Sequence, residues 1–304
     1  MKVKYFDLKK IARMDRFSQL ALLAANEAIM SSGLKNSQEN WSENAGIILG
    51  SSIGGIETIN QSYKQVFEEG HNRLHPLTIP KIMNNSATSL ISIQYRIQGP
   101  SFTISSACSS ANHAMGLAYE TVKSRKTSIM ITGGSESFLS FGGIKPWESL
   151  RVLSPNKCRP FSKGRDGLVH GEGAGIFVFE SLASAKKRKA VIIAEVVGFA
   201  MSTDASDLIK PNNIGPQKAL EGVLKDAMIN KTDVTYINAH GTGTILNDKM
   251  ESEAINKVFG NHSRSVKVSS TKAMHGHLIG ATAAIELLAC TLAINENDIP
   301  PTIN

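Results

Sequence analysis

The chain has 304 residues, of which 41% are hydrophobic, 19% charged and 6% aromatic, with a formal net charge of +7. This composition can form a large buried core and excludes an intrinsically disordered protein. The excess of positive charge favours an acidic partner or an anionic substrate at encounter and specifies nothing further. We expect no nucleic-acid partner, because the densest basic run, residues 186–189, is not interleaved with aromatic side chains.

The sequence predicts a cytoplasmic protein without a membrane span. Its longest apolar stretch, residues 279–294, is interrupted by Glu286 and falls short of the roughly 18 to 20 uninterrupted residues of a spanning helix. The first ten residues are charged and lack the apolar core of a secretory signal. The three cysteines lie far apart without a CxxC pair, so we expect neither disulfides nor a zinc site.

Helical and strand-like segments alternate, as is typical of an α/β protein with a largely parallel, covered sheet. The first long helix is expected to follow Asp15, which can cap it, and to run to about Met30. Apolar patterns predict strands at residues 45–50, 102–106, 128–134, 175–180, 191–199, 234–239 and 266–270, and alanine-rich helices at 109–122 and 278–294. One compact domain is the simplest organisation, and two packed halves with a break near residue 181 stay open.

Cys108 is the strongest candidate for a nucleophile. It lies where the strand predicted at residues 102–106 turns into a helix, with serine and alanine on both sides. The N–H groups at a helix N-terminus stabilise a thiolate and can also hold an oxyanion, and small neighbours let a substrate approach. A buried structural cysteine is the alternative, and it is the interpretation that we prefer for Cys290; Cys158, in a polar loop, is expected to be incidental.

Two histidines occupy similar junctions. His240 ends a predicted strand and opens a His-Gly-Thr-Gly-Thr segment, and His277 follows the strand predicted at residues 266–270. Ligand pockets in α/β sheets lie at the carboxyl ends of strands, so the three junctions are expected to converge. A metal pair of His275 and His277 is disfavoured, because it lacks a neighbouring carboxylate or thiolate.

The motifs resemble those of the elongating β-ketoacyl-(acyl carrier protein) synthases of the thiolase fold, with some similarity to their nodulation-type branch. The matching segments run nearly from end to end: RMDRFSQ (13–19), GSSIGGIE (50–57), Gly99-Pro100, TISSACSSA (103–111), RPFSKGRDG (159–167), GEGAG (171–175), AHGTGT (239–244), Asn247-Asp248 with Glu251, and TKAMHGHLIG (271–280).

The resemblance implies a role for each matching residue. Cys108 corresponds to the acyl-accepting nucleophile, and His240 and His277 correspond to the two catalytic histidines. Initiating synthases usually have asparagine in place of the second histidine, so His277 implies elongation. The remaining matches are a lysine beside the site, its acidic partner, two hydroxyls for the carrier's pantetheine arm and two structural acids: Lys272, Glu286, Thr242 with Thr244, and Asp248 with Glu251.

For the acids, residue chemistry alone gives an expectation that can be set beside the role implied by the resemblance. A charge at Glu286 on an otherwise apolar helix is costly unless it is paired, which independently favours contact with Lys272. By contrast, Asp248 and Glu251 would be interpreted from the sequence alone as exposed residues at a helix start.

The resemblance implies a decarboxylative condensation. The Cys108 thiolate attacks an acyl thioester, and backbone N–H groups, including its own, hold the oxyanion. Malonyl thioester then loses carbon dioxide, and the two histidines stabilise the enolate that attacks the acyl group. No metal or organic cofactor is required, and the expected partners are an acyl carrier protein and a second copy of the chain, paired through residues 102–106.

The implied fold has two packed α/β halves in α-β-α-β-α layers, with residues 1–180 carrying the nucleophile and 181–304 the histidines. Members of the family usually have an additional strand at the start and continue for several dozen residues past the position of Asn304, so both ends are expected to be truncated. His275 replaces a residue that is usually small and polar.

Two other functions stay open. A catalytically silent ketosynthase-like scaffold would have no chemical need for Cys108, His240, Lys272 and His277 together. A Cys-His thioesterase would admit water to the acyl-enzyme and would not need a second histidine. Malonyl decarboxylation distinguishes a synthase from such a thioesterase.

Overall fold

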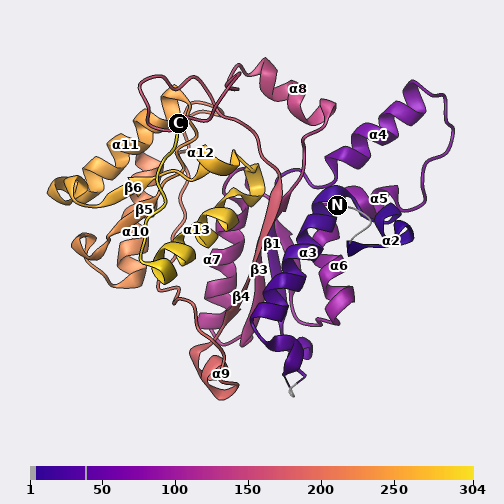
Figure 1. The fold of residues 1–304 in the computed structure, drawn as a ribbon, viewed down its shortest axis with the longest axis horizontal. Helices are drawn as coiled ribbons and strands as arrows, with labels where there is room; N and C mark the ends of the chain where they lie inside the picture. The colour runs from indigo at the N-terminus through magenta and orange to yellow at the C-terminus, as the bar shows by residue number, and fades with distance from the viewer. Residues whose placement is uncertain (1–4, 38–39) are drawn as a thin grey trace. The chain divides into compact units, whose positions relative to one another are not determined.

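The computed structural model describes residues 5–37 and 40–304 (Figure 1). Its α-helices are α2 (Leu8–Ala12), α3 (Arg16–Ser31), α4 (Ile56–Phe67), α5 (Thr78–Ile82), α6 (Ser86–Tyr95), α7 (Ser110–Lys123), α8 (Phe141–Ser149), α9 (Leu182–Lys187), α10 (Ile214–Ala227), α11 (Ile245–Phe259), α12 (Lys272–His275) and α13 (Thr282–Glu296). Its strands are β1 (Gly46–Gly50), β2 (Ser101–Ile104), β3 (Ile129–Glu136), β4 (Gly173–Glu180), β5 (Tyr236–Asn238) and β6 (Lys267–Ser269).

The chain forms two compact units, each assembled from separate stretches. The first unit contains the described residues up to Ser149 together with Gly171–Ile192 and Leu278–Ile285. The second contains Leu150–His170, Ile193–His277 and Glu286–Asn304. A single boundary near residue 181 therefore describes halves of the sequence and does not describe these compact units.

The first unit is built on a four-stranded sheet with the order β2-β1-β3-β4. Strands β2, β1 and β3 run parallel, and β4 pairs antiparallel with β3, so the prediction of a largely parallel sheet is confirmed with one antiparallel edge. Alternate side chains of β1 point to opposite faces of the sheet. Ile47 and Leu49 join the core formed with α3 and α6, whereas Ile48 packs with Ala114 and Ala118 of α7.

Helices α3 and α7 therefore lie on opposite faces of this sheet (Figure 1). The predicted cap of α3 is confirmed, because the buried carboxylate of Asp15 accepts a hydrogen bond from the backbone N–H of Phe17. The start of α7 lies against the end of β1: a Cβ at Gly50 would stand 2.2 Å from the backbone nitrogen of Ala111. Small residues at this contact hold the beginning of α7 at the carboxyl end of the sheet.

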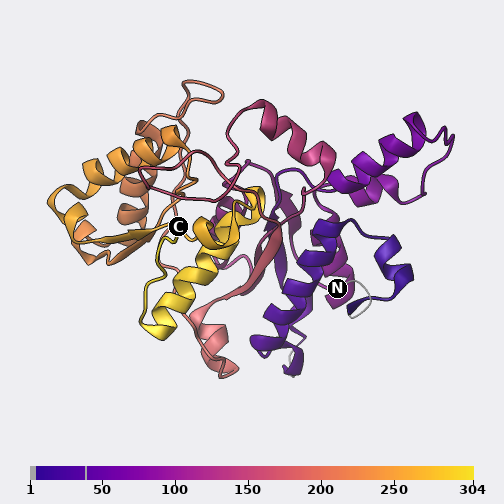
Figure 2. The same cartoon turned by 45° about the horizontal axis from the view of Figure 1, so that its top comes forward.

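The second unit has a two-stranded parallel sheet of β5 and β6. Helices α10 and α11 pack beside it around Ile255, Val258 and Phe259 (orange in Figure 2). The strand predicted at residues 191–199 is wrong, because that segment has no regular secondary structure and Val191 is 87% exposed. An extended segment becomes a strand only when a neighbouring strand accepts its backbone hydrogen bonds, and the described part of this unit pairs only β5 with β6.

The helix predicted at residues 278–294 starts as a 3₁₀ turn at Ile279–Ala281 and continues as α13. Within the described residues, Ile279–Glu296 is the one helical run with the length and apolar composition needed to cross a bilayer, which differs from the expectation based on Glu286. Core helices of other proteins have the same composition. Glu286 makes an ion pair with the buried side chain of Lys272, as expected of a charge on an otherwise apolar helix.

Candidate active site

The predicted strand-to-helix junction at Cys108 is confirmed. Strand β2 ends at Ile104 and α7 begins at Ser110, so the cysteine lies in the turn that feeds the helix. The preceding residue, Ala107, has a left-handed backbone with φ of +51°, which is a costly conformation for a residue with a side chain. Cys108 is partly accessible. This turn gives the thiol the helix N-terminal position that favours a thiolate.

His240 follows β5, as predicted, and its backbone is fixed by an acid of α11. The N–H groups of His240 and Gly241 donate to the two carboxylate oxygens of Glu251 at 2.6 and 2.7 Å. Glu251 is therefore half-buried against the loop that begins at His240, and its interpretation as an exposed helix-start residue is wrong.

Asp248, one turn earlier on α11, is 1% exposed. Its carboxylate accepts hydrogen bonds from the N–H groups of Gly243 at 3.2 Å and Phe161 at 2.8 Å, and the Nε of Arg165 lies 3.5 Å from it. The interpretation of Asp248 as an exposed helix-start residue is therefore wrong. Helical spacing alone did not show that the loop folds back over the start of α11.

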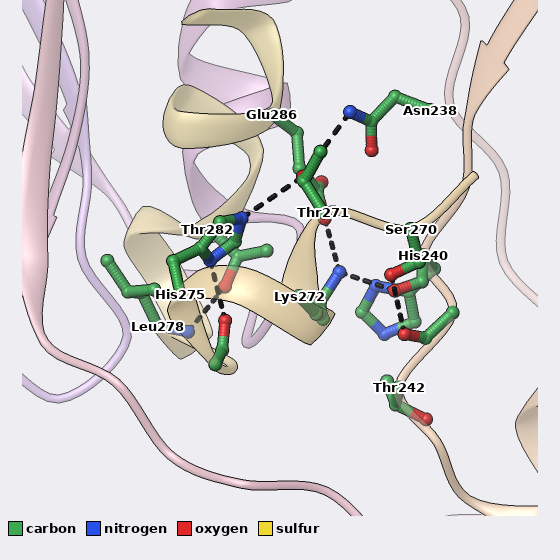
Figure 3. Close-up of polar contacts among 12 residues, drawn as sticks. Asn238, His240, Thr242, Ser270, Thr271, Lys272, His275, Leu278, Thr282 and Glu286 are labelled. Carbon is green, nitrogen blue, oxygen red and sulfur yellow. Dashed lines mark hydrogen bonds and ion pairs between the residues drawn. The ribbon is translucent and has the colours of Figure 1, made fainter. Parts of the chain in front are cut away.

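Lys272 is a buried cation in the second unit and lies between His240 and Glu286, with which it forms a polar cluster (Figure 3). Its Nζ donates to the backbone carbonyl of His240 and makes an ion pair with Glu286, whose side chain is 14% exposed. The contact expected from the cost of a lone charge on α13 is present. The carboxylate and the carbonyl satisfy the buried ammonium and hold it in place.

The rings of His240 and His277 lie edge to face, with centroids 5.3 Å apart. His277 is 1% exposed, and its backbone N–H donates to the carbonyl of Val169 at 2.7 Å. At this separation one acceptor oxygen can receive an N–H from each ring. Such a pair of donors is suited to stabilising negative charge that develops on a carbonyl oxygen.

Burial lowers the pKa of both histidines well below the ordinary value of 6.5, and the Lys272 cation lowers the pKa of each further. Both rings are therefore neutral near pH 7. A neutral imidazole has one N–H to donate and one lone pair, so these rings act as hydrogen-bond donors without needing to lose a proton.

Thr242 and Thr244 lie on the loop that follows His240. Thr242 is 5% exposed, and the two hydroxyl oxygens are 2.9 Å apart. Cys158, expected to be incidental, is in fact buried, and its thiol donates to the carbonyl of Thr242 at 3.6 Å. No local pattern predicts this contact, because 84 residues separate the two positions.

His275 lies on α12 beside the same cluster (Figure 3). Its Nδ1 donates to the carbonyl of Gly276 at 2.7 Å, which leaves Nε2 to accept from the hydroxyl of Thr271 at 3.1 Å. Burial lowers the pKa of His275, which is consistent with this neutral tautomer. Hydrogen bonds to Gly276 and Thr271 therefore hold the His275 ring in place.

Two family models match most of the chain. Residues 3–185 match the model of the β-ketoacyl synthase N-terminal domain, and residues 193–304 match that of the β-ketoacyl synthase C-terminal domain. The chain belongs to the β-ketoacyl synthase family. The resemblance carried by the motifs is confirmed.

Similar curated proteins of this family come from two branches. Nodulation protein E of Rhizobium sp. (strain N33) is 45% identical over 298 residues, which are 98% of this chain and 74% of that protein. The 3-oxoacyl-[acyl-carrier-protein] synthase 2 of Staphylococcus aureus is 40% identical over 307 aligned positions, covering 99% of this chain and 76% of that protein.

Solved ketosynthase structures confirm the fold. The ishigamide ketosynthase/chain length factor superimposes with a TM-score of 0.93 at 33% identity, covering 99% of this chain and 76% of that one. A type II polyketide synthase acyl-carrier protein in complex with its ketosynthase bound to the hexaketide gives a TM-score of 0.84 at 30% identity, covering 91% of this chain and 71% of that one. The chain thus has the ketosynthase fold of the thiolase type.

Proposed function

We propose that this chain condenses an acyl group held on Cys108 with a malonyl group delivered by an acyl carrier protein, extending the acyl chain by two carbons. The observation that carries the proposal is the neutral pair of His240 and His277 beside the buried Lys272. A hydrolase needs one base to activate water, whereas enolate stabilisation benefits from two donors on one oxygen.

In the first step, the thiolate of Cys108 attacks the carrier thioester and the carrier thiol leaves. The position before α7 supports this role, since the free N–H groups of a helix start favour negative charge on both sulfur and oxyanion. The product is an acyl-enzyme with the acyl group bonded to sulfur.

In the second step, malonyl thioester loses carbon dioxide and the electron pair of the broken C–C bond forms an enolate. His240 and His277 donate hydrogen bonds to its oxygen, and the carbanion attacks the acyl carbonyl on Cys108. The sulfur then leaves as thiolate. This step requires the Cys108 thiol to reach the space between the two rings. We assign Thr242 and Thr244 to hydrogen bonding of the carrier arm, and the hydroxyl pair that they form on the loop after His240 supports this assignment.

The decisive experiment incubates the chain with acyl carrier thioester and measures its intact mass. We expect an adduct of one acyl group that is absent in Cys108→Ala and present in the control Cys290→Ala, which removes another free thiol. Addition of malonyl carrier should then release carbon dioxide and the lengthened product. Hydrolysis of the adduct without decarboxylation would instead identify a thioesterase, and the absence of an adduct would identify a silent scaffold.

We further propose that the chain pairs with a second copy through β2. This strand is the edge of the first unit's sheet, and Phe102 on it is 42% exposed. An edge strand with an exposed aromatic residue offers both backbone hydrogen bonds and apolar area to a partner strand. Light scattering at micromolar concentration should give the mass of a dimer and, for Phe102→Lys, that of a monomer; a monomeric wild-type chain would contradict the proposal.

A further inference from the structure

Glu136 is a fully buried acid for which the proposed reaction has no use. It ends β3 in the first unit, is 0% exposed, and was not singled out by any sequence motif. Its surroundings supply hydrogen-bond donors in an unusual number. The carboxylate receives the backbone N–H groups of Ser52 at 2.6 Å, Ile53 at 3.3 Å and Gly280 at 3.1 Å, and the hydroxyl of Ser51 at 3.2 Å.

These four donors are neutral and come from two segments far apart in the chain. Each carboxylate oxygen accepts two of them, Oε1 from Ser51 and Ile53, and Oε2 from Ser52 and Gly280. Burial raises the pKa of the Glu136 carboxyl, and the four hydrogen bonds offset only part of this rise. Two donors point at each oxygen, so both positions must accept hydrogen bonds. The two oxygens of a carboxylate do so, whereas the NH₂ group of an amide cannot.

The loop that Glu136 holds is the one that supports the nucleophile turn. The hydroxyl of Ser52 donates to the carbonyl of Ala107 at 2.7 Å, and the carbonyl of Ser52 accepts from the hydroxyl of Ser105 at 3.0 Å. Ser52 therefore bonds two residues of the cysteine turn: Ala107, directly before Cys108, and Ser105, three residues before it. Ala107 is also the residue with the left-handed backbone, so this contact opposes its tendency to relax.

The second segment held by Glu136 begins directly after His277 in the sequence. Gly280 lies against the carboxylate so closely that a Cβ there would stand 2.4 Å from Oε2 and 2.5 Å from the nitrogen of Ser52. The turn containing Gly280 is closed by a hydrogen bond from the N–H of Leu278 to the hydroxyl of Thr282 at 2.7 Å. One carboxylate thus fixes both the loop beneath the cysteine and the segment that leaves the second histidine.

We propose that Glu136 is a positioning residue for Cys108, acting through Ser52 and the carbonyl of Ala107. It touches neither substrate nor the reacting atoms. The inference rests on the proposed function in so far as Cys108 is the nucleophile. Its effect is on the placement of the thiol and not on substrate binding.

The test measures the rate at which iodoacetamide alkylates Cys108, followed by peptide mass spectrometry in the full chain. Glu136→Gln preserves volume but places an amide NH₂ opposite backbone donors, so we expect alkylation to slow by about 10- to 100-fold, the range that a displacement of about 1 Å produces. In turnover, kcat should fall while KM stays unchanged. Alkylation of Glu136→Gln at the wild-type rate would overturn the inference.

Glu180→Gln is the matched control. Glu180 lies at the opposite end of the β3–β4 pair, its side chain is 6% exposed, and it bonds Arg188 and Ser184, away from the loop at residues 51–54. This variant should lose stability without a change in Cys108 alkylation. Equal slowing in both variants would show a general loss of packing and would also overturn the inference.

A second variant covers the case in which Glu136→Gln fails to fold. Ser52→Ala removes the hydroxyl that reaches Ala107 and leaves the buried carboxylate with its backbone donors, so we expect a folded chain with several-fold slower alkylation. An unchanged rate in Ser52→Ala would break the proposed link. The proposed function is tested separately by the wild-type chain, in which Cys108 should react faster with iodoacetamide than Cys290. If it does not, Cys108 is not an activated nucleophile and the proposed function fails, whereas the role of Glu136 is judged by the difference between wild type and variants.

Discussion

The two compact units stabilise their candidate functional residues by different means. In the first unit the cysteine turn is held by hydroxyls, backbone groups and one acid whose donors are all neutral. In the second, the histidine loop is held by two acids and a buried lysine paired with Glu286. The neutral arrangement fixes the position of a thiol. In the second unit, burial lowers the pKa of the two histidine rings, and the Lys272 cation lowers it further.

Removing the cation should have the largest effect on stability. Lys272→Met leaves Glu286 buried without a partner, and loss of one member of a buried pair costs about 3–5 kcal/mol of unfolding free energy. Urea denaturation measures this loss. The double variant Lys272→Met/Glu286→Leu should recover most of the stability without recovering condensation. Wild-type stability of the single variant would show that the pair does not organise this unit.

The next largest effect is expected on catalysis, where a variant of His277 should separate acyl transfer to Cys108 from the decarboxylative condensation. His277→Leu removes one of the two proposed donors to the enolate, and loss of one such donor typically lowers kcat by about 100- to 1,000-fold. Formation of the acyl adduct on Cys108 should continue, because that step depends on the cysteine turn. The exposed His71 provides the control His71→Leu, which should leave both steps unchanged. Equal loss of both steps in His277→Leu would contradict this division.

A smaller effect is expected at the hydroxyl pair. Thr242→Val keeps the shape of the side chain and removes one hydrogen-bonding group, so KM for malonyl carrier should rise by about tenfold with kcat unchanged. Steady-state kinetics measure the two constants. Thr291→Val, on α13, serves as the control for loss of a threonine hydroxyl. A fall in kcat without a change in KM would assign Thr242 to the chemical step.

The smallest effect is a shift along the pH axis. Because the pKa values of His240 and His277 lie well below 6.5, decarboxylation should stay constant from pH 8 down to 6.5 and fall only at lower pH. The pH profile of kcat for the wild-type chain measures this acid limb. In the double variant, NMR titration of the imidazole protons should show the pKa values of His240 and His277 moved upward, because the Lys272 cation is gone. Unmoved titrations would show that burial alone lowers these pKa values.

The same pKa depression predicts how stability depends on pH. Below pH 6.5 the histidines of the unfolded chain take up protons that the folded rings do not, so the free energy of unfolding should decrease as the pH falls through this range. Thermal melting between pH 7 and 5 measures the slope. His240→Asn should reduce it, and a slope that does not change would contradict the assignment.

The sequence by itself determined the alternation of elements, the turn at Cys108, the cap at Asp15 and the family, because these depend on local spacing and on motifs of adjacent residues. It also determined that Glu286 needs a cationic partner, since an unpaired charge on an apolar helix is costly. Only the tertiary structure decided that Asp248 and Cys158 are buried, that Glu136 binds two distant loops, and that residues 191–199 form no strand. These outcomes depend on which distant backbone groups meet, and hydrogen-bond partners separated by tens of residues leave no period in the sequence.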